Sequence, residues 1–215
     1  MPSPTNDPLH PLARLRRSPL FWVALTALMG CTALLMRLTS APEKPLPDLG
    51  QVPAFSLTDQ TAKRFGSTDL TGRVWVANFI FTRCTTVCPI FSDRMARLQD
   101  ATQPLSQQVR LVSFSVDPEY DTPDVLAPYA ARFGAKPEFW YFLTGPISDI
   151  RSVVIDGMKT YMGDASTVEN PEALMHGSHF VLVDPRMKIR GYYSVDDDDT
   201  TARLSRDISR LLAEE

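Results

Sequence analysis

One stretch constrains the fold more than any other. A nearly continuous apolar segment at residues 74–81 leads directly into two cysteines, Cys84 and Cys88, and then into a helical pattern. Such a segment is typical of a strand covered on both faces. Pro89 follows at once, and proline fits the first turn of a helix because its missing N–H would have no partner there. We therefore expect Cys84 in the turn before a helix and Cys88 at or near its start.

This placement favours thiolate chemistry. The unpaired backbone N–H groups and the dipole at a helix start stabilise a thiolate relative to a thiol. The thiolate is the form that binds a metal or attacks a disulfide. The pair Cys84 and Cys88 therefore indicates cysteine chemistry. The C-x-x-x-C spacing lets the sulfurs form a disulfide or bind one ion together, so both remain open.

Apolar and turn patterns along the rest of the chain predict an α/β domain. The alternation of strands and helices implies a thioredoxin-like sandwich, a central mixed sheet flanked by helices, because cysteines between the first core strand and its helix are the thioredoxin arrangement. Strands are expected at residues 55–59, 64–65, 74–81, 109–116, 140–143, 180–184 and 189–193, and helices at 89–102, 122–133, 147–161 and 200–212.

The N-terminal region predicts a membrane anchor. Residues 18–36 carry no charge, and about 20 apolar residues are needed to cross a bilayer. We therefore divide the chain into a cytoplasmic tail at 1–17, a transmembrane helix at 18–38, a Pro-rich linker at 39–53 and the globular domain at 54–215.

Charge around the anchor predicts its orientation. Arg14, Arg16 and Arg17 precede the apolar segment and only Arg37 follows it closely. The positive-inside rule then keeps the first residues in the cytoplasm. We expect a single-pass protein of a bacterial inner membrane, with its C-terminal domain in the periplasm. The alternative is a lipoprotein with Cys31 as the lipidated residue, since residues 28–31 resemble a lipoprotein box.

The charge balance argues against nucleic-acid binding. The whole chain has a formal net charge of −3, and the part after residue 40 is more acidic than the whole. A basic patch is the usual sign of a nucleic-acid site, and an acidic exported domain lacks one. Nucleic acid is therefore not an expected partner.

A metal site needs further ligands beyond the two thiolates. Two thiolates with an imidazole suit Cu(I), and a further oxygen ligand suits Cu(II). The imidazole candidates are His176 and His179, just before the predicted strand at 180–184. In a thioredoxin-type fold the loop before that strand lies against the cysteine turn. Asp117, at the end of the strand at 109–116, is either a group near the metal or an ordinary turn residue.

Four separated blocks resemble the Sco/SenC family of copper-binding, thioredoxin-fold assembly factors for cytochrome c oxidase. They are residues 81–89, residues 114–123, the His176 loop, and residues 180–185 with 189–193. The resemblance covers roughly residues 50–195. It implies a copper site, Cu(I) or Cu(II), held by Cys84, Cys88 and His176. The implied partner is subunit II of cytochrome c oxidase, with another periplasmic copper chaperone or a thiol reductant as further candidates.

The sequence departs from the family pattern at three places. Gly177 follows the ligand histidine, Met187 replaces the glycine of a D-P-x-G turn, and Asp196 to Asp199 form an acidic run. The acidic run is most simply a solvated loop. Three methionines, Met158, Met162 and Met175, are most simply core residues.

Two functions remain in view. The favoured one is a membrane-tethered metallochaperone that delivers copper to the binuclear site of subunit II, rather than an enzyme. The alternative is a thiol-disulfide reductase in which Cys84 and Cys88 cycle and keep the target's cysteines reduced. A plain structural disulfide and a peroxidase or sensing role are weaker readings.

Overall fold

The computed structural model describes residues 19–39, 44–160 and 179–214. Contacts divide the chain into two units, Met1–Pro45 and Leu46–Glu215. The first contains helix α2 (Pro19–Thr39), whose described side chains carry no charge. Among the described residues, no helix has both the length and the apolar character that a membrane crossing requires.

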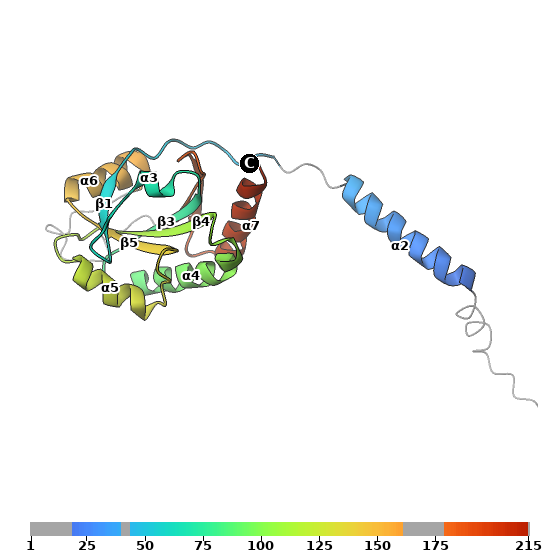
Figure 1. Cartoon of the computed structure of the whole chain (residues 1–215), viewed down its shortest axis with the longest axis horizontal. Helices are drawn as coiled ribbons and strands as arrows, with labels where there is room; N and C mark the ends of the chain where they lie inside the picture. The colour runs from blue at the N-terminus through green and yellow to red at the C-terminus, as the bar shows by residue number, and fades with distance from the viewer. Residues whose placement is uncertain (1–18, 40–43, 161–178, 215) are drawn as a thin grey trace, which may run out of the picture. The chain divides into compact units, whose positions relative to one another are not determined.

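The second unit is built on a seven-stranded mixed sheet with strand order β2-β1-β5-β4-β3-β6-β7 (Figure 1). Strands β3, β4 and β5 are parallel, and the other pairings are antiparallel. This confirms the predicted mixed sheet. The bounds are β1 (Ser56–Asp59), β2 (Arg64–Gly66), β3 (Val74–Ile80), β4 (Val109–Ser115), β5 (Trp140–Thr144), β6 (His179–Val183) and β7 (Ile189–Ser194).

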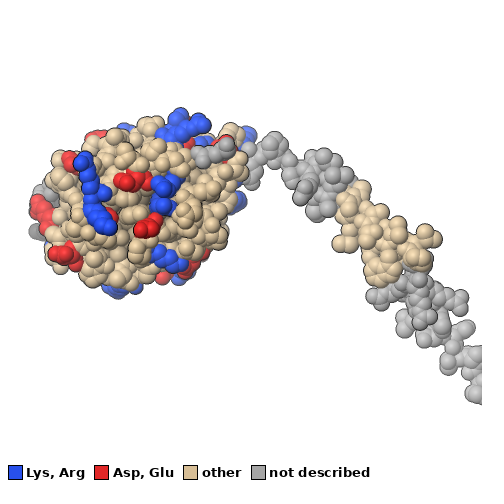
Figure 2. All heavy atoms as spheres, viewed as in Figure 1, with Lys and Arg blue, Asp and Glu red and all other residues tan. Residues whose placement is uncertain are grey.

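Helices cover both faces of the sheet. In Figure 1, α4 and α5 lie below the sheet, α3 and α6 lie above it, and α7 packs beside α4. The described helices of this unit are α3 (Ser67–Leu70), α4 (Val87–Thr102), α5 (Pro123–Arg132), α6 (Ile147–Arg151) and α7 (Thr200–Ala213), with a 3₁₀ turn, η1 (Gln103–Leu105). On the domain face in Figure 2, basic and acidic side chains are interspersed.

The central strands form the core, as predicted. All seven residues of β3 are buried, because helices cover both of its faces. A short polar chain nevertheless crosses this core. The indole Nε1 of Trp140 donates to Ser113 Oγ at 2.8 Å, and Ser113 Oγ donates to Asn78 Oδ1 at 2.6 Å. Strands β5, β4 and β3 are thus joined by side chains as well as by the backbone.

The predicted helix at 147–161 is confirmed as far as Gly157, but it changes type along its length. The α-helix α6 ends at Arg151, and a π-helix, η2 (Ser152–Gly157), follows. The N–H of Met158 accordingly donates to the carbonyl of Val153, five residues back. At Gly157, a Cβ would lie 2.5 Å from Cδ of Pro53, so this turn needs a glycine where it meets the incoming chain.

The second part of the predicted linker at 39–53 is bound to the domain. The N–H of Leu49 donates to the carbonyl of Ile189. The N–H of Ile189 donates in turn to the carbonyl of Gly50. Val52 likewise donates to Met187, whose φ of 65° puts a non-glycine residue in the left-handed region. This segment therefore lies along the β6–β7 hairpin. The remaining domain bounds stay predictions.

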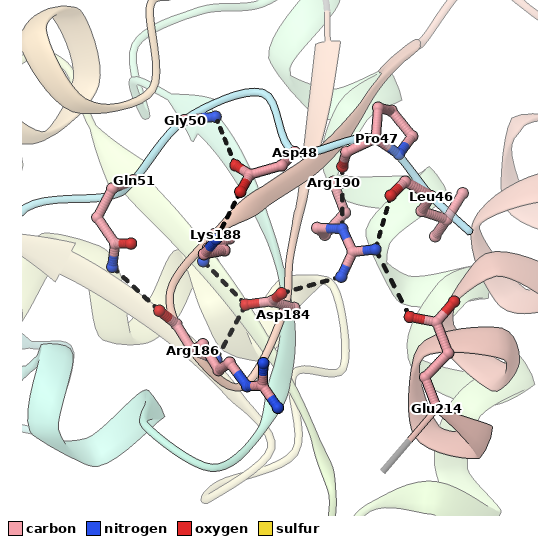
Figure 3. Close-up of polar contacts among 10 residues, drawn as sticks. All are labelled: Leu46, Pro47, Asp48, Gly50, Gln51, Asp184, Arg186, Lys188, Arg190 and Glu214. Carbon is pink, nitrogen blue, oxygen red and sulfur yellow. Dashed lines mark hydrogen bonds and ion pairs between the residues drawn. The ribbon is translucent and has the colours of Figure 1, made fainter.

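Arg190, on β7, binds the same N-terminal segment through its side chain (Figure 3). Its guanidinium donates to Asp184 Oδ2 at 3.0 Å and to the carbonyls of Pro47 and Leu46 at 2.9 and 2.7 Å. A carboxylate oxygen of Glu214 lies 3.5 Å away. Asp184 in turn accepts from two backbone N–H groups of the hairpin turn. One largely buried guanidinium therefore joins the segment, the hairpin and the end of the chain.

Candidate metal centre

The cysteine turn lies where the sequence placed it. Strand β3 ends at Ile80, and the N–H of Cys84 closes a turn onto the carbonyl of Phe81 at 3.1 Å. Helix α4 begins at Val87, so Cys88 is its second residue. The pattern of an apolar strand, a short turn and a proline in the first helical turn therefore predicted this geometry correctly.

Both thiols are free and buried. Cys84 is 5% exposed and Cys88 is fully buried. The backbone N–H of Cys88 donates to Cys84 Sγ at 3.4 Å, and the hydroxyl of Thr86 lies 3.8 Å from the same sulfur. The first turn of α4 therefore directs hydrogen-bond donors at Cys84, as expected for a helix start.

The two thiols differ in their acidity. Burial opposes ionisation of Cys84, but hydrogen bonds from the backbone N–H groups of Cys88 and Thr86 outweigh it, so the pKa of Cys84 lies below its ordinary value. Burial raises the pKa of Cys88 strongly, and a charge on Cys84 raises it further. Cys84 is thus the thiol that ionises first.

Asp117 lies beside this turn and is held by an arginine. Its carboxylate is nearly fully buried and accepts from Nε and Nη2 of Arg83 at 3.0 and 2.5 Å. The same guanidinium lies 4.6 Å above the ring of Tyr120. Asp117 is therefore bound to the residue that precedes Cys84.

Sequence reasoning missed Asp121, which is also buried under the turn. Its carboxylate accepts from the N–H and the hydroxyl of Thr82, and from the hydroxyl of Ser115 at 2.6 Å. Burial raises the pKa of Asp121, although these hydrogen bonds partly oppose the shift. The available signal was its position within residues 114–123, one of the blocks that carry the family resemblance, but no role is assigned to Asp121 from the sequence.

The third predicted ligand, His176, lies outside the described residues, as do Met162, Met175 and Gly177. His179, the other imidazole candidate, begins β6, is exposed, and pairs with Ser194 across the hairpin. No group of three or more His, Cys, Asp or Glu that could hold a metal was found within 19–39, 44–160 and 179–214. The Cys84, Cys88 and His176 set stays a prediction.

The other singled-out residues have ordinary surroundings. Met158 is fully buried in the core. The run from Asp196 to Asp199 is exposed, and Arg203 forms ion pairs with Asp197 and Asp199. This agrees with a solvated loop. Cys31 is a free, exposed cysteine on α2.

Fold and site together define a thioredoxin-like domain with a dithiol between the first central strand and its helix. A sequence model of the SCO1/SenC family matches residues 45–213, and the chain belongs to this family. The match includes the bound linker segment as well as the sheet.

Solved structures of similar proteins agree. A SCO1/SenC family lipoprotein from Bacillus anthracis is 36% identical, with a TM-score of 0.68 over 80% of this chain and 99% of its own. BsSco, described as a member of the Sco family of cytochrome c oxidase assembly proteins with a disulfide switch, is 31% identical, with a TM-score of 0.67 over 79% and 98%. Arabidopsis thaliana ScoI, solved with copper bound, is 26% identical, with a TM-score of 0.62 over 75% and 99%.

Proposed function

We propose that this protein is a membrane-tethered metallochaperone that delivers copper to the binuclear copper site of cytochrome c oxidase subunit II. The observation that carries the proposal is the buried dithiol, in which Cys84 Sγ accepts the N–H of Cys88. Family membership and the copper-bound relative from Arabidopsis thaliana support copper as the cargo. Soft thiolates prefer Cu(I), which agrees with this assignment.

Cys84, Cys88 and His176 would hold the copper. Because the pKa of Cys84 is lowered and that of Cys88 is raised, Cys84 offers the first thiolate. Cys88 becomes a thiolate only as the metal replaces its proton, so copper binding releases a proton. Transfer to the target then proceeds by exchange of ligands, one at a time.

A copper titration of the reduced protein tests this ligand set. We expect one copper per chain, and a sulfur-to-Cu(II) charge-transfer band in the oxidised complex. His176→Ala should abolish tight binding and remove that band. His179→Ala is the matched control, because His179 is exposed at the start of β6, and it should bind as the parent does. Full copper affinity in His176→Ala would contradict the proposed site.

The alternative function, a thiol-disulfide reductase, rests on the unequal acidities of Cys84 and Cys88. The thiol that ionises readily can attack a target disulfide and form a mixed disulfide. The second thiol can then attack that mixed disulfide and release the reduced target. His176→Ala separates the two functions, because it should leave dithiol cycling largely intact while copper binding is lost. A protein that takes up no stoichiometric copper but cycles readily would favour the reductase.

The membrane tether is part of the proposal. It is supported by the uncharged segment 18–36 and by the helix Pro19–Thr39, with the domain placed in the periplasm of a bacterium. We expect the full chain to stay with the inner-membrane fraction after an alkaline carbonate wash, and Cys31→Ser to behave in the same way. Release of Cys31→Ser would favour the lipoprotein alternative, and release of the parent chain would contradict tethering.

A further inference from the structure

A pair of arginines lies at the other end of the central strands from the cysteines. Arg73 directly precedes β3, and Arg110 is the second residue of β4. Arg110 pairs with Trp75, and Val112 pairs with Tyr141. Because side chains alternate along a strand, this register puts both arginines and Tyr141 on one face of the sheet.

These side chains line a hollow of about 680 Å³ at the sheet end, between the β1–β2 turn and α5. Lys63 and Glu138 contribute to the same wall. The ring of Phe65 stacks on Tyr141 with centroids 4.1 Å apart, so the aromatic wall is fixed in place. The hollow is therefore a defined site with several cations on its lining.

Neither arginine is neutralised in the part of the chain that the structure describes. Arg73 donates to the backbone carbonyl of Asp69, and its Nε is buried with no hydrogen-bond partner. Arg110 donates to the carbonyls of Ser106 and Val109. No described carboxylate lies within 4.0 Å of either guanidinium, so no ion pair offsets their repulsion.

Two acids on the lining of the hollow accept hydrogen bonds from backbone N–H groups. Asp59 accepts from the N–H groups of Thr61 and Lys63, and Asp69 accepts from the N–H of Gly66. Glu138 is the remaining acid among the described residues of the hollow, and its charge stabilises the protonated form of Arg110. Burial, followed by the neighbouring Arg73, holds the pKa of Arg110 below its ordinary value. Arg73 and Arg110 are thus two partly buried cations whose charges repel, and Tyr141 and Glu138 offset this repulsion only in part.

We propose that this hollow binds a phosphate group, with Arg73 and Arg110 as its two principal contacts. Two guanidinium groups, one just before β3 and one in β4, offer several N–H donors for the oxygens of a phosphate. A bound phosphate would also remove the repulsion between them. Both inorganic phosphate and the headgroup of a phospholipid carry this chemistry. The inference is independent of the copper site, which lies at the opposite end of β3.

Binding is tested with the full chain in a neutral detergent, using inorganic phosphate as the probe. We expect the unfolding temperature to rise with phosphate concentration at constant ionic strength, and chloride to have no such effect. Arg73→Gln and Arg110→Gln should each weaken phosphate binding about tenfold or more. Arg97→Gln is the matched control, because Arg97 pairs with Asp93 on the exposed surface of α4.

A second arm distinguishes the source of the phosphate. The chain is reconstituted in bilayers of phosphatidylcholine with or without phosphatidylglycerol, and amide hydrogen exchange around Arg110 is measured. Protection only with phosphatidylglycerol, lost in Arg110→Lys, assigns a lipid headgroup. Saturable binding of inorganic phosphate that needs both arginines assigns the free ion. The proposal is overturned if neither probe acts, or if both act equally on the parent and the arginine variants.

Discussion

The carboxylate of Asp121 accepts both the backbone N–H and the hydroxyl of Thr82. Thr82 is two residues before Cys84, and Asp121 is fully buried. A third hydrogen bond, from Ser115, fixes the carboxylate to the end of β4. Asp121 therefore attaches the cysteine turn to the neighbouring strand, alongside the Arg83–Asp117 pair. We predict that Asp121 sets the conformation of this turn.

Asp121 should give the protein a measurable pH dependence of stability. Its pKa is raised in the folded state, so the folded protein retains a proton that the unfolded chain, with a pKa of about 3.9, has lost. Its contribution to the free energy of unfolding must then fall as pH rises from about 4 through the raised pKa. Asp121→Asn removes this component.

The measurement is the free energy of urea unfolding of the parent and Asp121→Asn between pH 4 and 7. The difference, parent minus variant, should decrease as pH rises. A difference that stays constant or increases with pH would show that burial does not raise the pKa of Asp121 in the folded state.

The two cysteines should differ in reactivity. The pKa of Cys84 is lowered and that of Cys88 is raised, and the thiolate is the nucleophile. At pH 7.5, iodoacetamide should modify Cys84 in the Cys88→Ser variant about tenfold faster or more than it modifies Cys88 in Cys84→Ser. Mass spectrometry over time gives both rates, and equal rates would contradict the assigned order of ionisation.

Arg83 should contribute to stability through Asp117. Arg83→Gln removes both hydrogen bonds to a nearly buried carboxylate. Since Arg83 is itself about half exposed, water partly replaces it, and we expect a loss of about 1 kcal/mol in the free energy of unfolding. Arg97→Gln, which breaks an exposed pair with Asp93, should cost at most about 0.5 kcal/mol. Equal losses in urea titrations would count against a special role for Asp117.

Arg190 should be more costly to remove. Arg190→Gln leaves Asp184 with a buried, uncompensated charge, and breaking such a pair costs about 3 kcal/mol. The N–H groups of Leu49 and Val52 should also exchange faster with solvent, because the segment loses its attachment. Lys188→Gln is the control, since its pair with Asp48 is exposed. Unchanged exchange in Arg190→Gln would show that the backbone pairing alone holds the segment.

Much of the fold could be predicted because its signals are local. The buried strand at 74–81 shows in its apolar residues, and the position of Cys88 follows from Pro89. Strand β6 and helix α7 were likewise recognised from short patterns. These elements depend on burial and caps, which a sequence displays directly.

Contacts between distant segments could not be predicted in this way. Asp121 meets Thr82 only because β3 and β4 pair in one parallel register, and a sequence does not display that register. The attachment of Leu49 to β7 was hidden by a Pro-rich composition, which usually marks a free linker. The π-helix after Arg151 ends where Gly157 lies against Pro53, which is also a contact between distant segments.

The polar chain inside the sheet has a consequence for the dithiol. Asn78 and Ser113 are direct partners in the β3–β4 register and are joined by a hydrogen bond. A slip of two residues would keep every side chain on its face but separate this pair by roughly 6.6 Å. The same slip would carry Thr82 away from Asp121. The core hydrogen bond between Asn78 and Ser113 therefore helps to fix the position of the two sulfurs relative to β4. A core substitution that leaves both cysteines intact can still shift them relative to the neighbouring strand.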